Sequence, residues 1–280
     1  MLAQEARRHS PHTINHYRIS LKHLTTFMAD RGIDRVETIE ARSLREFMVD
    51  LQRRFKPKTA NGVASDARAF FRFLVAEEVL TKNPMANVEL PKLDLEILPA
   101  FSSHEVTALL KQAAGRSSLD LRNRAMMLVL LDSGVRLFEL VAMSVGDVDL
   151  QTGWFKVLGK GRKERICPVS PVTVKSLKAY MRVREGAPGE PLWLGTQGPL
   201  SRSGVGQVLD RIGERAGVHA HPHKFRRTCA LTMLRNGADI FSVQHLLGHT
   251  DLTVLKRYLA LTQSDYLEAH RKHSPVMKLT

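Results

Sequence analysis

The chain has 280 residues, enough for one large or two ordinary domains, and its lysines and arginines exceed its aspartates and glutamates by 42 to 28. The net charge of +14 predicts a polyanionic partner, nucleic acid or an anionic membrane surface, with a merely solubilising charge excess as the alternative. No apolar run approaches the roughly 20 residues of a membrane-spanning helix, so we expect no membrane span. Two isolated cysteines and an N-terminus without a signal-peptide core favour a cytoplasmic, nucleoid-associated protein.

The first 90 residues carry a helical period. Apolar residues recur at steps of three and four in three segments, one opening at Pro11, one around Phe47 and one running from about Pro57 to Leu80. This pattern predicts a small all-helical domain over residues 1–90. The next ten residues, 91–100, contain two prolines and no sustained period, and we interpret them as a linker.

A run of basic residues lies between the second and third helical segments. It comprises Arg53, Arg54, Lys56 and Lys58. These side chains are candidates for contact with a nucleic-acid backbone, and a solvated loop is the alternative.

The second domain is predicted over residues 101–280, which carry most of the positive charge. An apolar helix from Leu121 to Asp132 is expected to form its core, and a Ser-Gly-Val break then precedes Arg136. An unpaired buried charge is costly, so Arg136 needs a partner. The candidates are Glu139, three residues further along a helix, or a ligand anion.

A β-hairpin is predicted in the middle of this domain. Strands over 154–158 and 165–169 flank the glycine-bearing segment GKGRKER, in which Lys160 lies between two glycines. Such a hairpin could reach into a nucleic-acid groove, with Arg162, Lys163 and Arg165 as further candidate contacts. Helices otherwise dominate, so the predicted fold is mainly α with a small β-sheet.

The C-terminal part holds the most informative spacing. Predicted helices over 222–236, 239–247 and 251–260 separate a His-x-x-Arg pair, a Leu-Leu-Gly-His turn and a tyrosine. The polar residues are His223, Arg226, His249 and Tyr258. Arginine forks suit the non-bridging oxygens of a phosphodiester, histidines can move protons near neutral pH, and a tyrosine can attack phosphorus. The five histidines from 219 to 249 raise a metal site as an alternative, but no cysteine cluster or HExxH accompanies them.

Four motifs resemble those of one family. SGVRLFEL, VLGKGRKERICPV, PHKFRR and LLGHTDLTVLKRY are similar, in this order, to the boxes of the tyrosine recombinases, the phage integrase family, and the whole chain is similar to compact Xer-type members. The resemblance implies that Tyr258 is the nucleophile and that Glu139 supports the site. It implies a catalytic set of Arg136, Lys160, His223, Arg226, His249 and Tyr258. Arg227 departs from the histidine usual there, and it and Lys224 are further candidate DNA contacts.

The resemblance also implies an architecture and a reaction. A SAM-like four-helix core-binding domain and an α+β catalytic domain would form a C-shaped clamp on double-stranded DNA. A homo-tetramer on two sites, monomeric or dimeric off DNA, would exchange strands through a 3′-phosphotyrosine and a Holliday junction without cofactors. The tail, residues 261–280, would dock on a neighbouring protomer. A partner recombinase or DNA translocase is left open, and no membrane is involved.

Two other functions stay open at this stage. A type IB topoisomerase-like enzyme would relax DNA with similar chemistry, although the small helical N-terminal domain and the tail argue against it. A DNA-binding regulator without strand exchange would have lost one of the residues Arg136, Arg226 and Tyr258, and all three are present.

Overall fold

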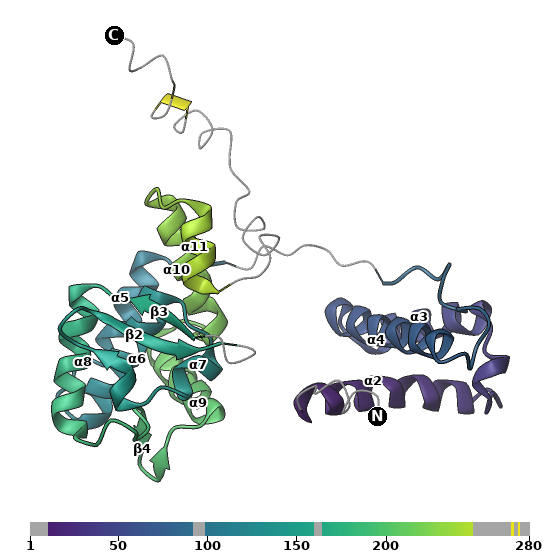
Figure 1. The fold of residues 1–280 in the computed structure, drawn as a ribbon, viewed down its shortest axis with the longest axis horizontal. Coiled ribbons are helices and arrows are strands. Elements are labelled where there is room, and N and C mark those ends of the chain that lie inside the picture. The colour runs from purple at the N-terminus through teal and green to yellow at the C-terminus, as the bar shows by residue number, and fades with distance from the viewer. Residues whose placement is uncertain (1–10, 92–98, 160–163, 249–269, 272–273, 275–280) are drawn as a thin grey trace. The chain divides into compact units, whose positions relative to one another are not determined.

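The computed structural model describes residues 11–91, 99–159, 164–248, 270–271 and 274 (Figure 1). The chain divides into two compact units, Met1–Glu96 and Ile97–Thr280, here called unit one and unit two. Within the described ranges, no helix has both the length and the apolar character needed to cross a membrane. The predicted mainly α-helical fold with a small sheet is confirmed.

The regular elements in the described part of unit one are all helical. Helices α2 (Pro11–Ala29) and α3 (Ala41–Arg54) both pack on α4 (Pro57–Ala76), and a short 3-10 turn, η1 (Val36–Thr38), lies between α2 and α3. The predicted apolar positions form the core, where Phe47 and several neighbours are fully buried.

The third helix of unit one is shorter than its sequence pattern predicts. It ends at Ala76 rather than near Leu80, because Glu78 adopts a left-handed conformation with φ of +58°. The Val79 N–H then donates to the Leu74 carbonyl at 3.0 Å, which closes the helix end and turns the chain back.

Unit two is built around one buried helix. Helix α6 (Ser118–Ser133) packs between α8 (Pro171–Arg184) and α10 (Pro222–Arg235), as the predicted core role requires (Figure 1). Helix α5 (Ser103–Lys111) begins at the Ser102–Glu105 capping box and packs on α9 (Arg202–Ala216).

A small antiparallel sheet lies beside these helices. Its order is β1 (Val148–Asp149), β2 (Trp154–Leu158) and β3 (Glu164–Pro168), and the β2–β3 hairpin was predicted from the sequence. Strand β1 was not predicted, because two residues are too few to show an alternating pattern.

The remaining elements connect and complete this core. Among the described residues of unit two, a 3-10 turn precedes β1, a two-stranded ribbon follows α8, and there are two further short helices. They are α7 (Leu137–Val141), η2 (Val145–Asp147), β4 (Leu194–Gly195), β5 (Gly198–Pro199) and α11 (Ile240–Leu247).

A tight turn joins α6 to α7. Gly134 ends α6 in the left-handed region, with φ of +59°. A Cβ atom at this position would lie 2.5 Å from Leu247 Cδ2 and 3.2 Å from Cys229 Sγ. The turn therefore needs glycine for its backbone angle and for the close approach of α10 and α11.

We expect Gly134→Ala to lower the free energy of unfolding of unit two by roughly 2–5 kcal/mol, from left-handed strain plus overpacking. Gly217→Ala is the matched control, because Gly217 has φ of +66° but no atom within 4 Å of an added Cβ. Gly217→Ala should lower the free energy of unfolding only through backbone strain, by about 1–2 kcal/mol. Both tryptophans, Trp154 and Trp193, lie in unit two, so urea unfolding followed by their fluorescence measures the difference. If Gly134→Ala and Gly217→Ala lowered the free energy of unfolding equally, the explanation from close packing at Gly134 would be wrong.

Candidate active site

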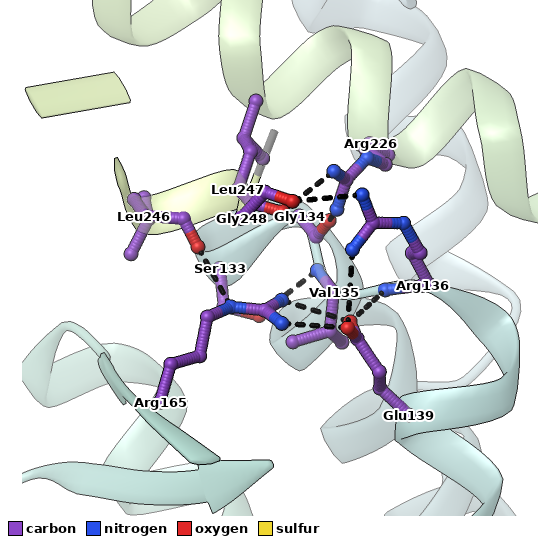
Figure 2. Close-up of polar contacts among 10 residues, drawn as sticks. All are labelled: Ser133, Gly134, Val135, Arg136, Glu139, Arg165, Arg226, Leu246, Leu247 and Gly248. Atoms are coloured by element: carbon purple, nitrogen blue, oxygen red, sulfur yellow. Dashed lines mark hydrogen bonds and ion pairs between the residues drawn. The ribbon is translucent and has the colours of Figure 1, made fainter. Parts of the chain in front are cut away.

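A buried carboxylate organises the predicted site. The Glu139 side chain, in the first turn of α7, has 0% exposure. Its oxygens accept the Arg136 backbone N–H at 2.7 Å and Arg136 Nη1 at 3.2 Å. They also accept both terminal nitrogens of Arg165, at 2.6 and 2.8 Å (Figure 2). Glu139, one of the two candidate partners of Arg136, is therefore in contact with it, and Arg165 shares this carboxylate through a bidentate fork.

Hydrogen bonds keep this carboxylate charged. Burial raises the pKa of Glu139, but the bonds from Arg165 and from the Arg136 backbone outweigh it and hold the pKa below its ordinary value. Burial also lowers the pKa of Arg165, and its bonds to Glu139 more than compensate. The two groups stabilise each other as ions.

Three arginines cap the C-terminal end of α11. Each donates to a different one of three consecutive backbone carbonyls, in the pairs Arg165 Nε–Leu246 O at 3.1 Å, Arg226 Nη2–Leu247 O at 2.7 Å and Arg136 Nη2–Gly248 O at 2.9 Å (Figure 2). These carbonyls have no partner within the helix and form the negative end of its dipole, so cations are favoured there. The next residue in the sequence is His249.

Arg226 is the most deeply buried of the predicted phosphate-binding arginines, with 8% of the residue exposed. It lies in the second turn of α10, and its Nη1 donates to the Gly134 carbonyl at the α6–α7 turn. Burial, and then the nearby charge of Arg136, lower the pKa of Arg226 to about 10. The side chain therefore stays protonated at neutral pH.

Arg136 and Arg226 retain donors for a ligand. Each guanidinium has five N–H groups and uses two of them in its contacts with the described residues. The Arg136 side chain is 32% exposed, so a phosphate oxygen can reach it from solvent. Two neighbouring planar forks are suited to bind the two non-bridging oxygens of one phosphodiester.

The other predicted catalytic residues divide into two groups. His223 is exposed in the first turn of α10, three residues before Arg226. Lys160, His249 and Tyr258 lie outside the described residues, as do the candidate DNA contacts Arg162 and Lys163.

The basic run predicted in unit one forms an exposed corner. Arg53 and Arg54 end α3, Lys56 is the N-cap of α4 and Lys58 lies in its first turn. Arg54 pairs with Asp50 at 2.9 Å, across one turn of the helix. All four cations are accessible, which a contact with a DNA backbone requires.

Three other candidate DNA contacts occupy internal positions instead. Arg165 is engaged at all three nitrogens, Lys224 pairs with Glu105 at 2.9 Å, and Arg227 donates to the Pro99 carbonyl at 2.8 Å. Residue type alone did not reveal these internal partners. A signal for Arg165 was its alternation with Cys167 on one face of β3, which is the face that the structure buries.

The histidines do not gather as ligands within the described part of the chain. No group of three His, Cys, Asp or Glu side chains there could hold a metal ion. His219 and His245 are exposed, and the His219 and His221 rings lie 5.3 Å apart.

We expect Glu139→Gln to lower the free energy of unfolding by roughly 3–5 kcal/mol at neutral pH, because Arg165 would keep its buried charge without a counter-ion. The folded pKa of Glu139 is depressed, so its contribution is complete above the ordinary value of 4.5 and is lost as pH falls through the folded pKa. Urea unfolding below pH 4.5 should therefore show a steeper loss for the wild type than for Glu139→Gln.

Glu164→Gln is the matched control for this prediction. Glu164 lies beside Arg165 on β3 and pairs with Lys156 at 3.6 Å, but its side chain is 59% exposed. Such a pair contributes about 0–1 kcal/mol, so this variant should unfold like the wild type. If Glu164→Gln lowered the free energy of unfolding as much as Glu139→Gln, burial of the Glu139 carboxylate would not explain its effect.

Two protein-family models match the two parts of the chain. Residues 3–78 match the model of the phage integrase N-terminal SAM-like domain, and residues 100–265 match that of the phage integrase family. Tyrosine recombinase XerC of Halalkalibacterium halodurans is 32% identical over 281 residues, covering 95% of this chain and 92% of that protein.

Solved structures share the fold. The XerA recombinase crystal structure aligns with 25% identity and a TM-score of 0.55, over 98% of this chain and 95% of that one. The XerH site-specific recombinase, in a post-cleavage complex with palindromic difH substrate, aligns with 19% identity and a TM-score of 0.77, over 98% and 82%. The chain therefore belongs to the phage integrase family and is a tyrosine site-specific recombinase.

Proposed function

We propose that the chain cleaves and rejoins double-stranded DNA through a 3′-phosphotyrosine formed by Tyr258. The observation that carries this proposal is the convergence of the Arg136 and Arg226 forks on the end of α11, directly before His249 in the sequence. Tyr258 follows nine positions later. XerH, which has this fold, is bound to its DNA substrate in the solved complex.

The proposed cleavage step is a transesterification with two proton transfers. The Tyr258 oxygen forms a bond to phosphorus while the bond from phosphorus to the 5′ oxygen breaks. Lys160 donates a proton to the departing oxygen, and a histidine of the pair His223 and His249 takes the tyrosine proton. Attack by a 5′-hydroxyl on the phosphotyrosine reverses the step. The phosphotyrosine bond retains the energy of the phosphodiester, so rejoining requires no ATP hydrolysis.

Arg136 and Arg226 provide electrostatic stabilisation in this scheme. The negative charge on the phosphate oxygens grows in the transition state, and two fixed cations stabilise it without reorganising. Glu139 and Arg165 contribute indirectly, because they fix the position of Arg136 and the end of α11.

The assembly follows from the same proposal. The helical domain 1–90 and the catalytic domain 101–280, joined by the linker 91–100, would close around one duplex as a clamp. Four protomers on two sites would exchange strands through a Holliday junction, held together by the tail 261–280. The exposed corner from Arg53 to Lys58 would contact the DNA backbone.

Trapping on a nicked duplex tests the nucleophile. The duplex carries a site selected from a randomised pool by binding to the protein, and EDTA is present. We expect a denaturant-resistant adduct with the wild type and none with Tyr258→Phe, whose DNA affinity should be unchanged. Tyr266→Phe is the matched control and should keep the adduct. Binding without any adduct would favour a DNA-binding regulator, and relaxation of a single plasmid without exchange would favour a topoisomerase-like enzyme.

A 5′-phosphorothiolate substrate tests the general acid. Its sulfur leaves without a proton, so we expect Lys160→Ala to be inactive on ordinary DNA and restored on this substrate. Arg226→Ala should lose roughly 10²–10³-fold in cleavage rate on both substrates, because it removes charge stabilisation rather than a proton. If Lys160→Ala stayed inactive on both, the proton would come from another group.

A further inference from the structure

One turn of α10 is enclosed by protein on all sides. Residues 224–230 are buried, including the charged side chains of Lys224, Arg226 and Arg227. A helix at the surface of a globular protein normally buries one stripe and leaves the opposite face to solvent. The position of the turn that carries Arg226 therefore depends on neighbours on two sides.

On one side of this turn, Arg226 contacts the predicted site. Its Nη1 donates to the Gly134 carbonyl, and its Nη2 donates to the Leu247 carbonyl (Figure 2). These bonds hold the end of the side chain. They do not by themselves fix the helix from which the side chain extends.

On the other side, the turn contacts the segment that begins α5. The Phe101 N–H donates to Thr228 Oγ1 at 2.9 Å. Lys224 Nζ bonds Glu105 Oε1, also at 2.9 Å. The Phe101 and Phe225 rings meet edge to face, with centroids 4.9 Å apart. These three interactions are here called the α5–α10 contact, and all of them lie within unit two.

The Thr228 hydroxyl uses both its acceptor and its donor in this contact. It accepts the Phe101 N–H and donates to the Lys224 carbonyl at 2.8 Å, one turn earlier in α10. Thr228 is 5% exposed and Phe101 is 6% exposed, so both bonds are shielded from solvent. A buried N–H that loses its acceptor is costly. One oxygen thus holds the Phe101 backbone against the α10 backbone.

The Glu105 carboxylate also bridges two elements. Its Oε2 accepts the Ser102 N–H at 2.7 Å in the capping box of α5, while its Oε1 binds Lys224 of α10. The bond from the Ser102 backbone, followed by the bond from Lys224, lowers the pKa of Glu105, so the carboxylate is charged at neutral pH. Lys224 Nζ also lies 4.4 Å from the centre of the Phe101 ring.

Rotation of α10 about its own axis is the movement that matters most for Arg226. Side chains extend about 5–6 Å from a helix axis, so a rotation of about 10° moves a group at that radius by about 1 Å. A misplacement of about 1 Å can lower a catalysed rate by about 10²-fold. Apolar packing tolerates small rotations, whereas directional bonds at Lys224 and Thr228, one turn apart, resist them.

We infer that Glu105 and Thr228 are positioning residues of this recombinase, which fix the rotation of the α10 turn and thereby the place of the Arg226 guanidinium. The inference rests on the proposed function, in which Arg226 stabilises the transition state of cleavage. Both residues act through Arg226, so their loss should appear in the cleavage rate rather than in DNA affinity.

Single-turnover cleavage of the nicked duplex tests the role of Thr228. Thr228→Val removes the hydroxyl and nearly conserves the shape, and Thr228→Ser restores the hydroxyl. We expect Thr228→Val to cleave about tenfold more slowly, as for the loss of one hydrogen bond, and to bind DNA within about twofold of the wild type. Thr228→Ser should cleave at close to the wild-type rate. Normal cleavage by Thr228→Val would overturn the inference.

Tyr180→Phe is the matched control for an effect of stability alone. The Tyr180 hydroxyl also joins two segments, because it donates to the Leu192 carbonyl at 3.0 Å and accepts the Leu194 N–H at 3.2 Å. Tyr180 is 1% exposed and lies on α8, and α6 packs between α8 and α10. Urea unfolding should show both variants to be destabilised, but Tyr180→Phe should cleave within about twofold of the wild-type rate. Equal slowing of both would attribute the effect to stability and contradict positioning.

Glu105→Gln tests the second positioning residue. A neutral amide accepts a weaker bond from Lys224, so we expect cleavage to slow by about threefold. Asp120→Asn is its matched control, because Asp120 also lies three residues after a helix N-cap, Ser117, and bonds it at 2.6 Å. This control should cleave at close to the wild-type rate. If both variants slowed equally, helix capping would explain the effect and Glu105 would have no positioning role.

A double variant distinguishes action through Arg226 from a general loosening of unit two. In an Arg226→Ala background no guanidinium remains to be misplaced. Adding Thr228→Val should therefore change the residual cleavage rate by no more than about twofold. Losses that multiply would show that Thr228 acts independently of Arg226, against the inference.

The NMR signal of the Arg226 Nε–H provides a readout that needs neither DNA nor cleavage. The signal is assigned by its loss in Arg226→Ala. It should shift in Thr228→Val and stay in place in Tyr180→Phe, and an unchanged signal in Thr228→Val would contradict positioning. If the wild type forms no adduct on any duplex, the proposed function fails, while this signal still decides whether Thr228 positions Arg226.

Discussion

One buried carboxylate and the end of one helix hold three arginines together. Arg136, Arg165 and Arg226 would repel each other in an apolar interior, and burial, followed by the nearby charge of Arg136, lowers the pKa of Arg226. Glu139 neutralises one charge and the α11 carbonyls stabilise the rest. The cluster keeps a positive excess in a fixed geometry. That excess is what a phosphodiester needs, and it exists before any DNA binds.

The charged groups of the cluster come from several elements that the fold brings together. The start of α7 supplies Arg136 and Glu139, β3 supplies Arg165, and α10 supplies Arg226. Gly134 permits the close approach that brings these elements together, because any side chain there would collide with α10 and α11. The helical core behind them is ordinary, and the precision of the site comes from charged hydrogen bonds to backbone carbonyls.

Much of this was predictable from local patterns. Helical periodicity, capping residues and the hairpin turn located most elements, and the spacing of Arg136 and Glu139 made their pairing one of two candidate interactions. The partner of Arg165 did not follow. Judged by polarity, the apolar Ile166 would face the core and the charged Arg165 would face solvent. The structure shows the reverse, because Ile166 is 60% exposed and Arg165 lies on the inner face of β3. Lys224 and Arg227 looked like DNA contacts because their acceptors lie more than 100 residues away, beyond the reach of any spacing argument.

Contacts on two sides of α10 join the site to the start of unit two. On one side of α10, Arg226 determines where the end of α11 lies, and His249 is the next residue but one after the Leu247 carbonyl that it holds. On the other side, Thr228 holds the backbone of Phe101 at the start of unit two. A rigid helical turn with both attachments cannot adjust one without the other, because packed interiors shift as units rather than deform gradually.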